Sequence, residues 1–297
     1  MLLLTVVYEG RRDLIGDINE LKEYLKSKGI LIGISESIVG EMQFIKIFCS
    51  EEEYNDKIVN TFNLYMANIL YKIAVCEFYD RDMMNFLNDT YFFLKPDEIR
   101  DVEILSMRML KGEDLNIDDC SIYCMNRKNN IINKIISCLK ENDEININGF
   151  ITFRMRELRE DIDFIIDKVV EKYMVEKEYS EFIKLLKYFV EIQDSKLETV
   201  NIIIDPNGKY FIRDKDGNDM LREFLNELSG EKITENNLED LIISGLITNA
   251  PKSINIHGVQ NCINKEIIDT INNVFADRVH ICEKCELCKS NMGVIRV

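Results

Sequence analysis

Four residues near the C-terminus have the types and spacing of metal ligands. They form the pattern His280-x-Cys282-x-x-Cys285-x-x-Cys288, in a chain that contains only two histidines. Thiolates and imidazoles bind zinc well, and closely spaced ligands reduce the chain entropy that is lost when a site closes. The simplest interpretation is a tetrahedral Cys3His zinc site. A structural role is favoured over a catalytic one, because no carboxylate base stands at a recognised spacing beside these ligands.

Two other interpretations of the three cysteines stay open. An iron–sulfur cluster would use them together with Cys262 as a fourth thiolate, although the proline-terminated run of bacterial ferredoxins is absent. The cysteines could also be reduced thiols that bind nothing, because C-x2-C-x2-C is not one of the strong paired zinc-knuckle spacings.

The other histidine, His257, follows a strand predicted over residues 253–256. Strand ends that open onto loops are where α/β domains place ligands, so His257 is a candidate site residue. We favour the plainer interpretation of an imidazole satisfied by a backbone carbonyl, because no serine or cysteine nucleophile pattern accompanies it. A metal-dependent redox enzyme that used the three cysteines would require this strand end to lie close to them.

The elements that would position these residues form a C-terminal α/β unit over residues 196–297. In order, they are the strands Thr199–Ile204 and Tyr210–Arg213 around a turn, helices over 220–228 and 235–244, a strand over 253–256, the helix Lys265–Phe275 and a strand over 278–281. Gly245 is expected to end the second helix. The last strand leads directly into the cysteines, so it would fix where they begin.

The rest of the chain divides into two further ranges. Residues 1–50 predict an N-terminal α/β unit, with a strand over 2–8, a helix over 13–28 closed by Gly29, and a hairpin over 30–38 and Met42–Cys49. Residues 51–195 contain one proline and two glycines, which favours a helical region. The sequence therefore predicts an α+β fold.

Two apolar stripes indicate the sides of helices that face the core of this middle range. The first comprises Leu158, Ile162, Ile165, Val169 and Tyr173, and the second, in the next predicted helix, comprises Phe182, Leu185, Leu186 and Phe189. Three arginines, Arg154, Arg156 and Arg159, precede or open the first of these helices among interleaved acidic residues. We interpret them as partners in intrahelical ion pairs such as Arg156–Glu160.

Composition restricts the class of function. The net charge of −16 is spread along the chain, which disfavours binding to nucleic acids and to anionic membrane surfaces. No stretch approaches the roughly 20 apolar residues of a membrane helix. Residues 1–8 lack the basic leader of a signal peptide, and nine cysteines are an odd number that suits a reducing compartment. We therefore expect a cytoplasmic protein.

Four segments carry a resemblance to a known family. They are Asn-Gly-Phe-Ile-Thr-Phe-Arg over 148–154, the hairpin segments 200–205 and 210–212, Ala-Pro-Lys-Ser-Ile-Asn-Ile-His over 250–257, and the stretch over 279–288 that holds the cysteines. In these segments, and in length and segment order, the chain resembles the YtxC-like sporulation proteins of endospore-forming Firmicutes. The resemblance implies a cytosolic protein associated with spore formation, in a family without an established molecular activity, so it supplies no catalytic residues.

Two function hypotheses follow. The first is a non-enzymatic sporulation-associated factor that acts through contacts with a protein partner and uses zinc to lock its C-terminal tail. This hypothesis predicts an exposed apolar patch on a helix or a sheet. The second is a metal- or iron–sulfur-dependent redox enzyme built on Cys282, Cys285 and Cys288. The sequence lacks the common phosphate-loop, dinucleotide-binding, serine-hydrolase and zinc-protease motifs, which favours the first.

Overall fold

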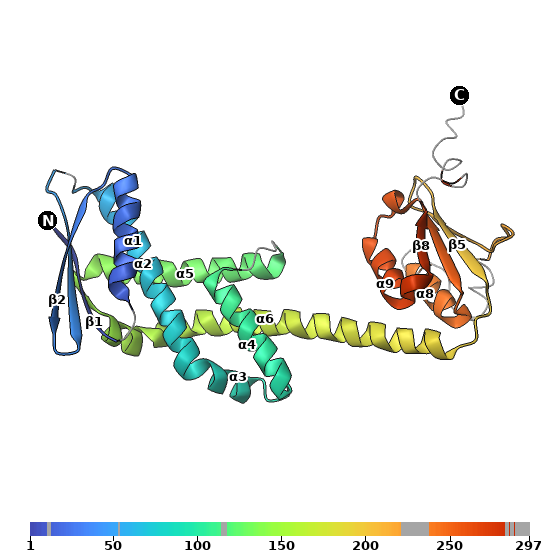
Figure 1. Cartoon of the computed structure of the whole chain (residues 1–297), viewed down its shortest axis with the longest axis horizontal. Coiled ribbons are helices and arrows are strands. Elements are labelled where there is room, and N and C mark those ends of the chain that lie inside the picture. The colour runs from blue at the N-terminus through green and yellow to red at the C-terminus, as the bar shows by residue number, and fades with distance from the viewer. Residues whose placement is uncertain are drawn as a thin grey trace, which may run out of the picture. The chain divides into compact units, whose positions relative to one another are not determined.

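The computed structural model describes residues 1–10, 13–52, 54–113, 118–220, 238–282, 285 and 288. The chain forms two compact units, Met1–Met174 and Val175–Val297, each with its own hydrophobic core (Figure 1). The α+β class is confirmed by two small sheets and a long helical part. The ranges 1–50, 51–195 and 196–297 follow changes of element type along the chain, whereas these two units follow contacts in space.

The first unit opens with a four-stranded sheet in the order β2-β3-β1-β4. Its strands are β1 (Leu2–Glu9), β2 (Ile32–Val39), β3 (Met42–Cys49) and β4 (Glu144–Asn146). Helix α1 (Leu14–Ser27) starts where the Asp13 carboxylate accepts the Gly16 N–H at 2.9 Å. It ends before Gly29, whose φ of +79° suits glycine. The predicted strand, helix and hairpin of this unit are confirmed, and β4 is an addition that sequence reasoning missed.

Helices make up most of the described chain from residue 56 to residue 192, apart from the short strand β4. They are α2 (Asp56–Phe78), the π-helical turn η1 (Tyr79–Met83), α3 (Met84–Thr90), α4 (Pro96–Lys111), α5 (Asp119–Glu141) and α6 (Ile147–Ile192). Helix-breaking residues lie at helix ends here. Pro96 is the first residue of α4, and Gly112 closes the same helix with a φ of +77°. The helical region expected from the scarcity of proline and glycine is therefore confirmed.

Helix α6 is one continuous element of 46 residues rather than two successive helices. Its first apolar stripe is confirmed, because Leu158, Ile162, Ile165 and Val169 are buried in the first core, with Tyr173 packed against it. The second stripe was wrong about which side of the helix is buried. Leu186 is buried, but the buried residues around it are Ile183 and Val190, while Phe182, Leu185 and Phe189 are exposed. This part of α6 has apolar residues on two sides, so the sequence allowed either side to face the core. In the structure, the side with Ile183, Leu186 and Val190 packs into the second core.

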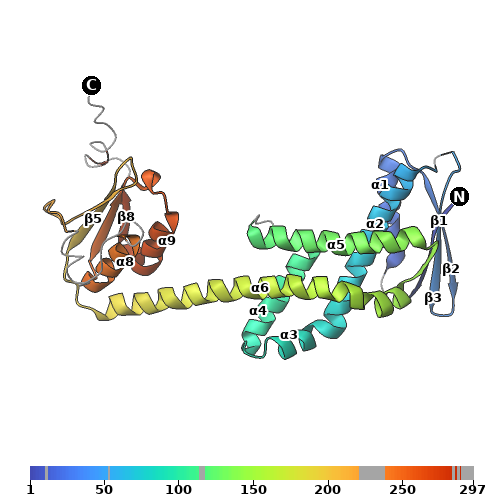
Figure 2. The ribbon, with the colours of Figure 1, turned by 180° about the vertical axis from the view of Figure 1, so that it is seen from behind.

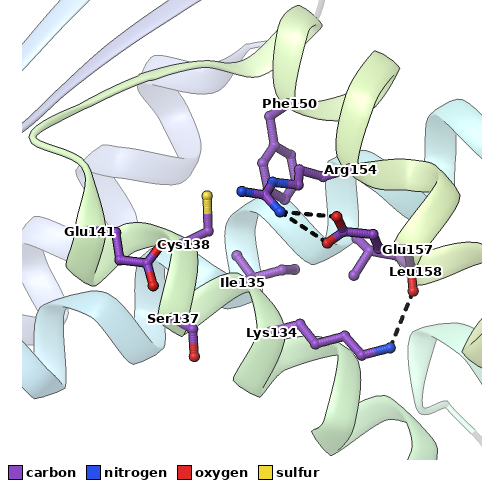
Figure 3. A pocket seen from close by; sticks show the side chains of 9 residues that line it. All are labelled: Lys134, Ile135, Ser137, Cys138, Glu141, Phe150, Arg154, Glu157 and Leu158. Atoms are coloured by element: carbon purple, nitrogen blue, oxygen red, sulfur yellow. Dashed lines mark hydrogen bonds and ion pairs between the residues drawn. The ribbon is translucent and has the colours of Figure 1, made fainter.

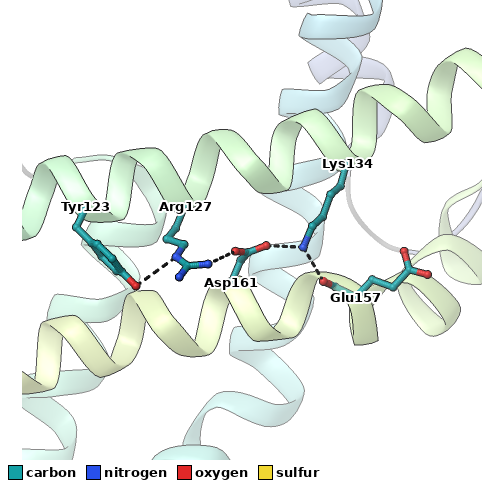
Figure 4. Close-up of polar contacts among 5 residues, drawn as sticks. All are labelled: Tyr123, Arg127, Lys134, Glu157 and Asp161. Atoms are coloured by element: carbon teal, nitrogen blue, oxygen red, sulfur yellow. Dashed lines mark hydrogen bonds and ion pairs between the residues drawn. The ribbon is translucent and has the colours of Figure 1, made fainter.

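Helices α5 and the first part of α6 run antiparallel beside each other (Figures 1 and 2). A buried carboxylate joins them, since Asp161 of α6 accepts from Arg127 at 3.1 Å and from Lys134 at 2.6 Å, both on α5. Arg127 also donates to the hydroxyl of Tyr123 at 3.2 Å, and Lys134 donates to the backbone carbonyl of Glu157 at 3.1 Å (Figure 4). Burying the Asp161 carboxylate is tolerated because two cations neutralise it.

The second unit holds a sheet in the order β6-β5-β7-β8. Its elements are β5 (Thr199–Ile204), β6 (Tyr210–Arg213), α8 (Leu238–Asn249), β7 (Ser253–His257), α9 (Lys265–Phe275) and β8 (Val279–Cys282). Strands β5 and β6 form the predicted hairpin, while β5, β7 and β8 are parallel. One face of the sheet supplies core residues such as Ile202 and Ile256, which pack with α8 and α9. Alternation along the strands places Asn201, Asn255 and His257 on the opposite face.

Two expectations for the second unit need comment. The helix predicted over 220–228 lies almost wholly outside the described residues. Helix α8 does not end at Gly245 but continues to Asn249, and Gly245 is buried within it. The cost of about 1 kcal/mol for a glycine inside a helix is offset here by the packing of α8 into the core, where Ile242 and Leu246 are fully buried.

Candidate metal centre

The C-terminal cysteines meet a histidine at the end of the parallel strands. Strands β7 and β8 are neighbours in a register that pairs His257 with Cys282. The potential ligand atoms of His257, Cys282, Cys285 and Cys288 all lie within 4.8 Å of one another. His257 and Cys288 are buried, and the other two cysteines are partly buried. The structure therefore brings together the three cysteines that the sequence singled out and adds His257.

His280, the histidine expected among the ligands, lies outside this group. Its side chain is exposed on β8, where its backbone is in register with Asn255. Two residues along a strand advance about 6.6 Å, whereas neighbouring strands are only about 4.8 Å apart. Cys282 is therefore closer to its neighbour across the sheet, His257, than to His280 on its own strand.

Four of the six distances within the group are close to those of tetrahedral coordination. The Cys285 and Cys288 sulfurs are 3.6 Å apart, and those of Cys282 and Cys288 are 3.9 Å apart. His257 Nδ1 lies 3.2 Å from the sulfur of Cys285 and 3.5 Å from that of Cys288. A zinc ion with bonds of about 2.3 Å to sulfur separates its ligands by about 3.8 Å. The sulfurs are too far apart for a disulfide, whose S–S bond is about 2.05 Å, so the set fits a metal.

Local electrostatics act on the two buried candidate ligands in opposite ways. Burial and hydrogen bonds with the other two cysteines raise the pKa of Cys288 to about 11, so this thiol is protonated at neutral pH until a cation displaces its proton. Burial lowers the pKa of His257, which keeps the imidazole in the neutral form that binds metals. The backbone N–H of Cys288 points to the sulfur of Cys285 at 3.4 Å, a contact that stabilises a thiolate ligand.

Cys262, considered as a fourth thiolate for an iron–sulfur cluster, belongs to a different network. Its sulfur is 3.0 Å from the backbone oxygen of Asn264 and 3.3 Å from the hydroxyl of Tyr210. It is not part of the group that His257 completes. A cluster at this centre would therefore draw on three thiolates and an imidazole among the described side chains.

Two of the three arginines at the start of α6, Arg154 and Arg159, form ion pairs. Arg154 donates to both carboxylate oxygens of Glu157 at 3.0 Å, beside a pocket of about 250 Å³ (Figure 3). Arg159 lies 3.4 Å from Asp163 and 3.6 Å from Asp82. Intrahelical ion pairing is confirmed for these two arginines, although their partners differ from the Arg156–Glu160 pair that we named. Carboxylates thus neutralise the positive charges of Arg154 and Arg159.

Comparison with known proteins identifies the family. The sequence pattern of the YtxC-like family matches residues 64–280, well over half of the chain, so this chain belongs to the YtxC-like family. It is 26% identical over 143 residues to a protein of Bacillus subtilis (strain 168) described as "Uncharacterized protein YtxC". That match covers 48% of this chain and 50% of the relative, about half the length of each. No solved structure matches the chain.

The family match includes His257 but stops before Cys282. The case for a metal centre in this chain therefore depends on the geometry of these four residues rather than on the comparison. Of the helices that the structure describes, none combines the length and the apolar composition needed to cross a membrane.

Proposed function

We propose that His257, Cys282, Cys285 and Cys288 hold a structural zinc ion that ties the C-terminal end of the chain to the β7–β8 edge of the second sheet. The observation that carries this proposal is the closed set of four protein ligands. Catalytic zinc sites usually keep one position for water or substrate, whereas structural sites are filled by four side chains. Bound zinc would contribute its binding free energy to the folding of the second unit.

The test is the metal content of full-length protein purified without oxygen or chelator. We expect one zinc per chain and no visible colour. His257→Ala and Cys285→Ser should lose the zinc, while His280→Ala, the matched control, should keep it. Zinc retained by His257→Ala but lost by His280→Ala would contradict the ligand set.

The redox alternative also has an observation in its favour, because it required the end of β7 to lie near the cysteines, and His257 does. Three thiolates and one imidazole can also hold iron. A brown protein that contains iron, with colour that bleaches on reduction, would replace the zinc proposal with this one. Colourless protein with zinc would exclude it.

We further propose that the protein is a non-enzymatic factor of spore formation that acts in the cytoplasm through a protein partner. The association with sporulation is supported by the resemblance to the family, and the location by the odd number of cysteines. The contact surface is supported by apolar side chains spaced three or four residues apart on α6, which are exposed. They are Val175, Tyr179, Phe182, Leu185, Phe189 and Ile192.

A complementation experiment in an endospore-forming host tests this role. Deletion of the gene should lower the number of heat-resistant spores, and the wild-type gene should restore it. Phe182→Ser combined with Phe189→Ser should fold and bind zinc but fail to restore spore numbers. Ile104→Ser, which changes an exposed residue on α4 (58% exposed), is the control and should restore them. Unchanged spore numbers in the deletion strain would refute the role.

A further inference from the structure

The second nitrogen of His257 contacts an amide on the neighbouring strand. His257 Nε2 lies 3.4 Å from Oδ1 of Asn201 on β5, and the Nδ2 of Asn255 donates to the same oxygen at 3.0 Å. The other end of the Asn201 amide, Nδ2, donates to the backbone carbonyl of Asp214 at 3.1 Å. These contacts come from the face of the sheet opposite the core.

The chemistry of these groups determines which way the Asn201 amide points. A backbone carbonyl can only accept, so the atom that faces Asp214 must be the nitrogen Nδ2. The oxygen Oδ1 then faces Asn255 and His257, and it can only accept from them. A hydrogen bond at His257 Nε2 therefore requires a proton on that nitrogen.

The position of this proton defines the ligand atom. A neutral imidazole carries a single N–H, so a proton on Nε2 leaves the lone pair on Nδ1. Nδ1 is also the nitrogen that faces the sulfurs of Cys285 and Cys288, at 3.2 and 3.5 Å. The contact at Nε2 and the contacts at Nδ1 thus indicate the same tautomer, with the proton on Nε2 and the lone pair on Nδ1.

We propose that Asn201 is a positioning residue of the metal centre, which holds His257 in the Nε2–H tautomer and directs Nδ1 to the metal. The proposal rests on metal binding by His257 and deepens it. Partners of this kind orient metal-bound histidines and raise their basicity, and their loss typically weakens metal binding about 10–100-fold.

The loop after β6 holds Asn201 in place. The carboxylate oxygen Oδ1 of Asp214 accepts from the backbone N–H groups of Asp216 and Asn218, both at 2.8 Å. Asn218 Nδ2 donates to Oδ2 of the same carboxylate at 2.8 Å. The carbonyl that accepts from Asn201 therefore belongs to a turn closed by three hydrogen bonds, so both ends of the amide have partners.

Zinc affinity of the full chain tests the proposal, measured by competition with a chromophoric chelator. Asn201→Leu should weaken zinc binding about 10–100-fold. Asn201→Asp keeps an acceptor for Nε2–H but loses the donor to the Asp214 carbonyl, so it should weaken zinc binding less than Asn201→Leu does. His280→Ala is the control, since the His280 side chain is exposed on β8 outside the ligand group, and it should bind zinc normally. Equal affinity for Asn201→Leu and wild type would overturn the proposal.

Nitrogen-15 NMR of the imidazole gives a readout independent of affinity. In the His280→Ala background one histidine remains, and its zinc-loaded spectrum should show a protonated Nε2 and a metal-bound Nδ1. Coordination through Nε2 would overturn the inference even though zinc is bound. Without zinc, the Nε2–H signal should persist in that background and exchange away in Asn201→Leu. This arm tests the role of Asn201 even if the wild-type protein takes up no zinc, which would refute the proposed function alone.

Discussion

Asp118 fastens the start of α5 to α6 within the first unit. Its carboxylate accepts the backbone N–H of Ser121 at 2.7 Å, as the N-cap of α5, and the ammonium of Lys172 at 2.6 Å. The hydrogen bond from Lys172, followed by those from Ser121, lowers the pKa of Asp118 to about 2. The Asp118 side chain thus caps the start of α5 and joins this helix to α6.

This depressed pKa gives a pH dependence with a definite sign. The group contributes stability above its ordinary pKa of 3.8, and the contribution is lost as the pH falls toward about 2. Asp118→Asn should lower the free energy of unfolding by about 1 kcal/mol at pH 6, since the pair is partly exposed to solvent. Urea unfolding followed by helical circular dichroism should show the difference narrowing between pH 4 and pH 3. A difference that widens on acidification would contradict the assignment.

At the scale of elements, two adjacent leucines can test which side of α6 faces the core of the second unit. Leu186 is buried, and Leu185 is 51% exposed. Leu186→Ala should lower the free energy of unfolding of the second unit by about 2 kcal/mol or more, because it leaves a cavity. Leu185→Ala should change it by less than about 0.5 kcal/mol. Thermal unfolding of the two variants would check this. A larger loss of stability for Leu185→Ala than for Leu186→Ala would support the buried side expected from the sequence.

Local signals account for the elements that could be predicted from the sequence. The β5–β6 hairpin, α9 and β8 follow from alternation, turn residues and helical spacing over a few positions. The three cysteines of the candidate metal centre were singled out for the same reason, since their spacing is visible along the chain. Strand β4 was not predicted because three residues carry too little pattern to distinguish a strand from a helix end.

The role of His257 could not be read in the same way. It depends on the parallel register between β7 and β8, which is a property of two segments separated by a helix. A sequence signal did exist, because His257 ends a predicted strand that precedes the strand leading to the cysteines. Strands of a parallel sheet end at the same edge, so their last residues are natural neighbours.

At the scale of the whole molecule, each unit has its own core, and the candidate metal centre belongs to the second unit. Removing zinc with a strong chelator should therefore affect the two units unequally. Hydrogen exchange should accelerate at β7 and β8, while β1 and β3 keep their protection. Exchange measured by mass spectrometry, with His280→Ala as a metal-binding control, would check this. Uniform acceleration in both units would show that zinc supports the entire fold.

Strand β4 has a consequence for vectorial synthesis on the ribosome. It pairs in parallel with β1, so that Val6 lies opposite Ile145. At about 5–20 residues per second, the stretch between Glu9 and Glu144 takes on the order of ten seconds to translate. Throughout that interval the nascent chain presents one edge of β1 without its final neighbour, and such edges pair readily with other chains. Transcripts truncated ahead of β4 should therefore yield fragments prone to aggregation.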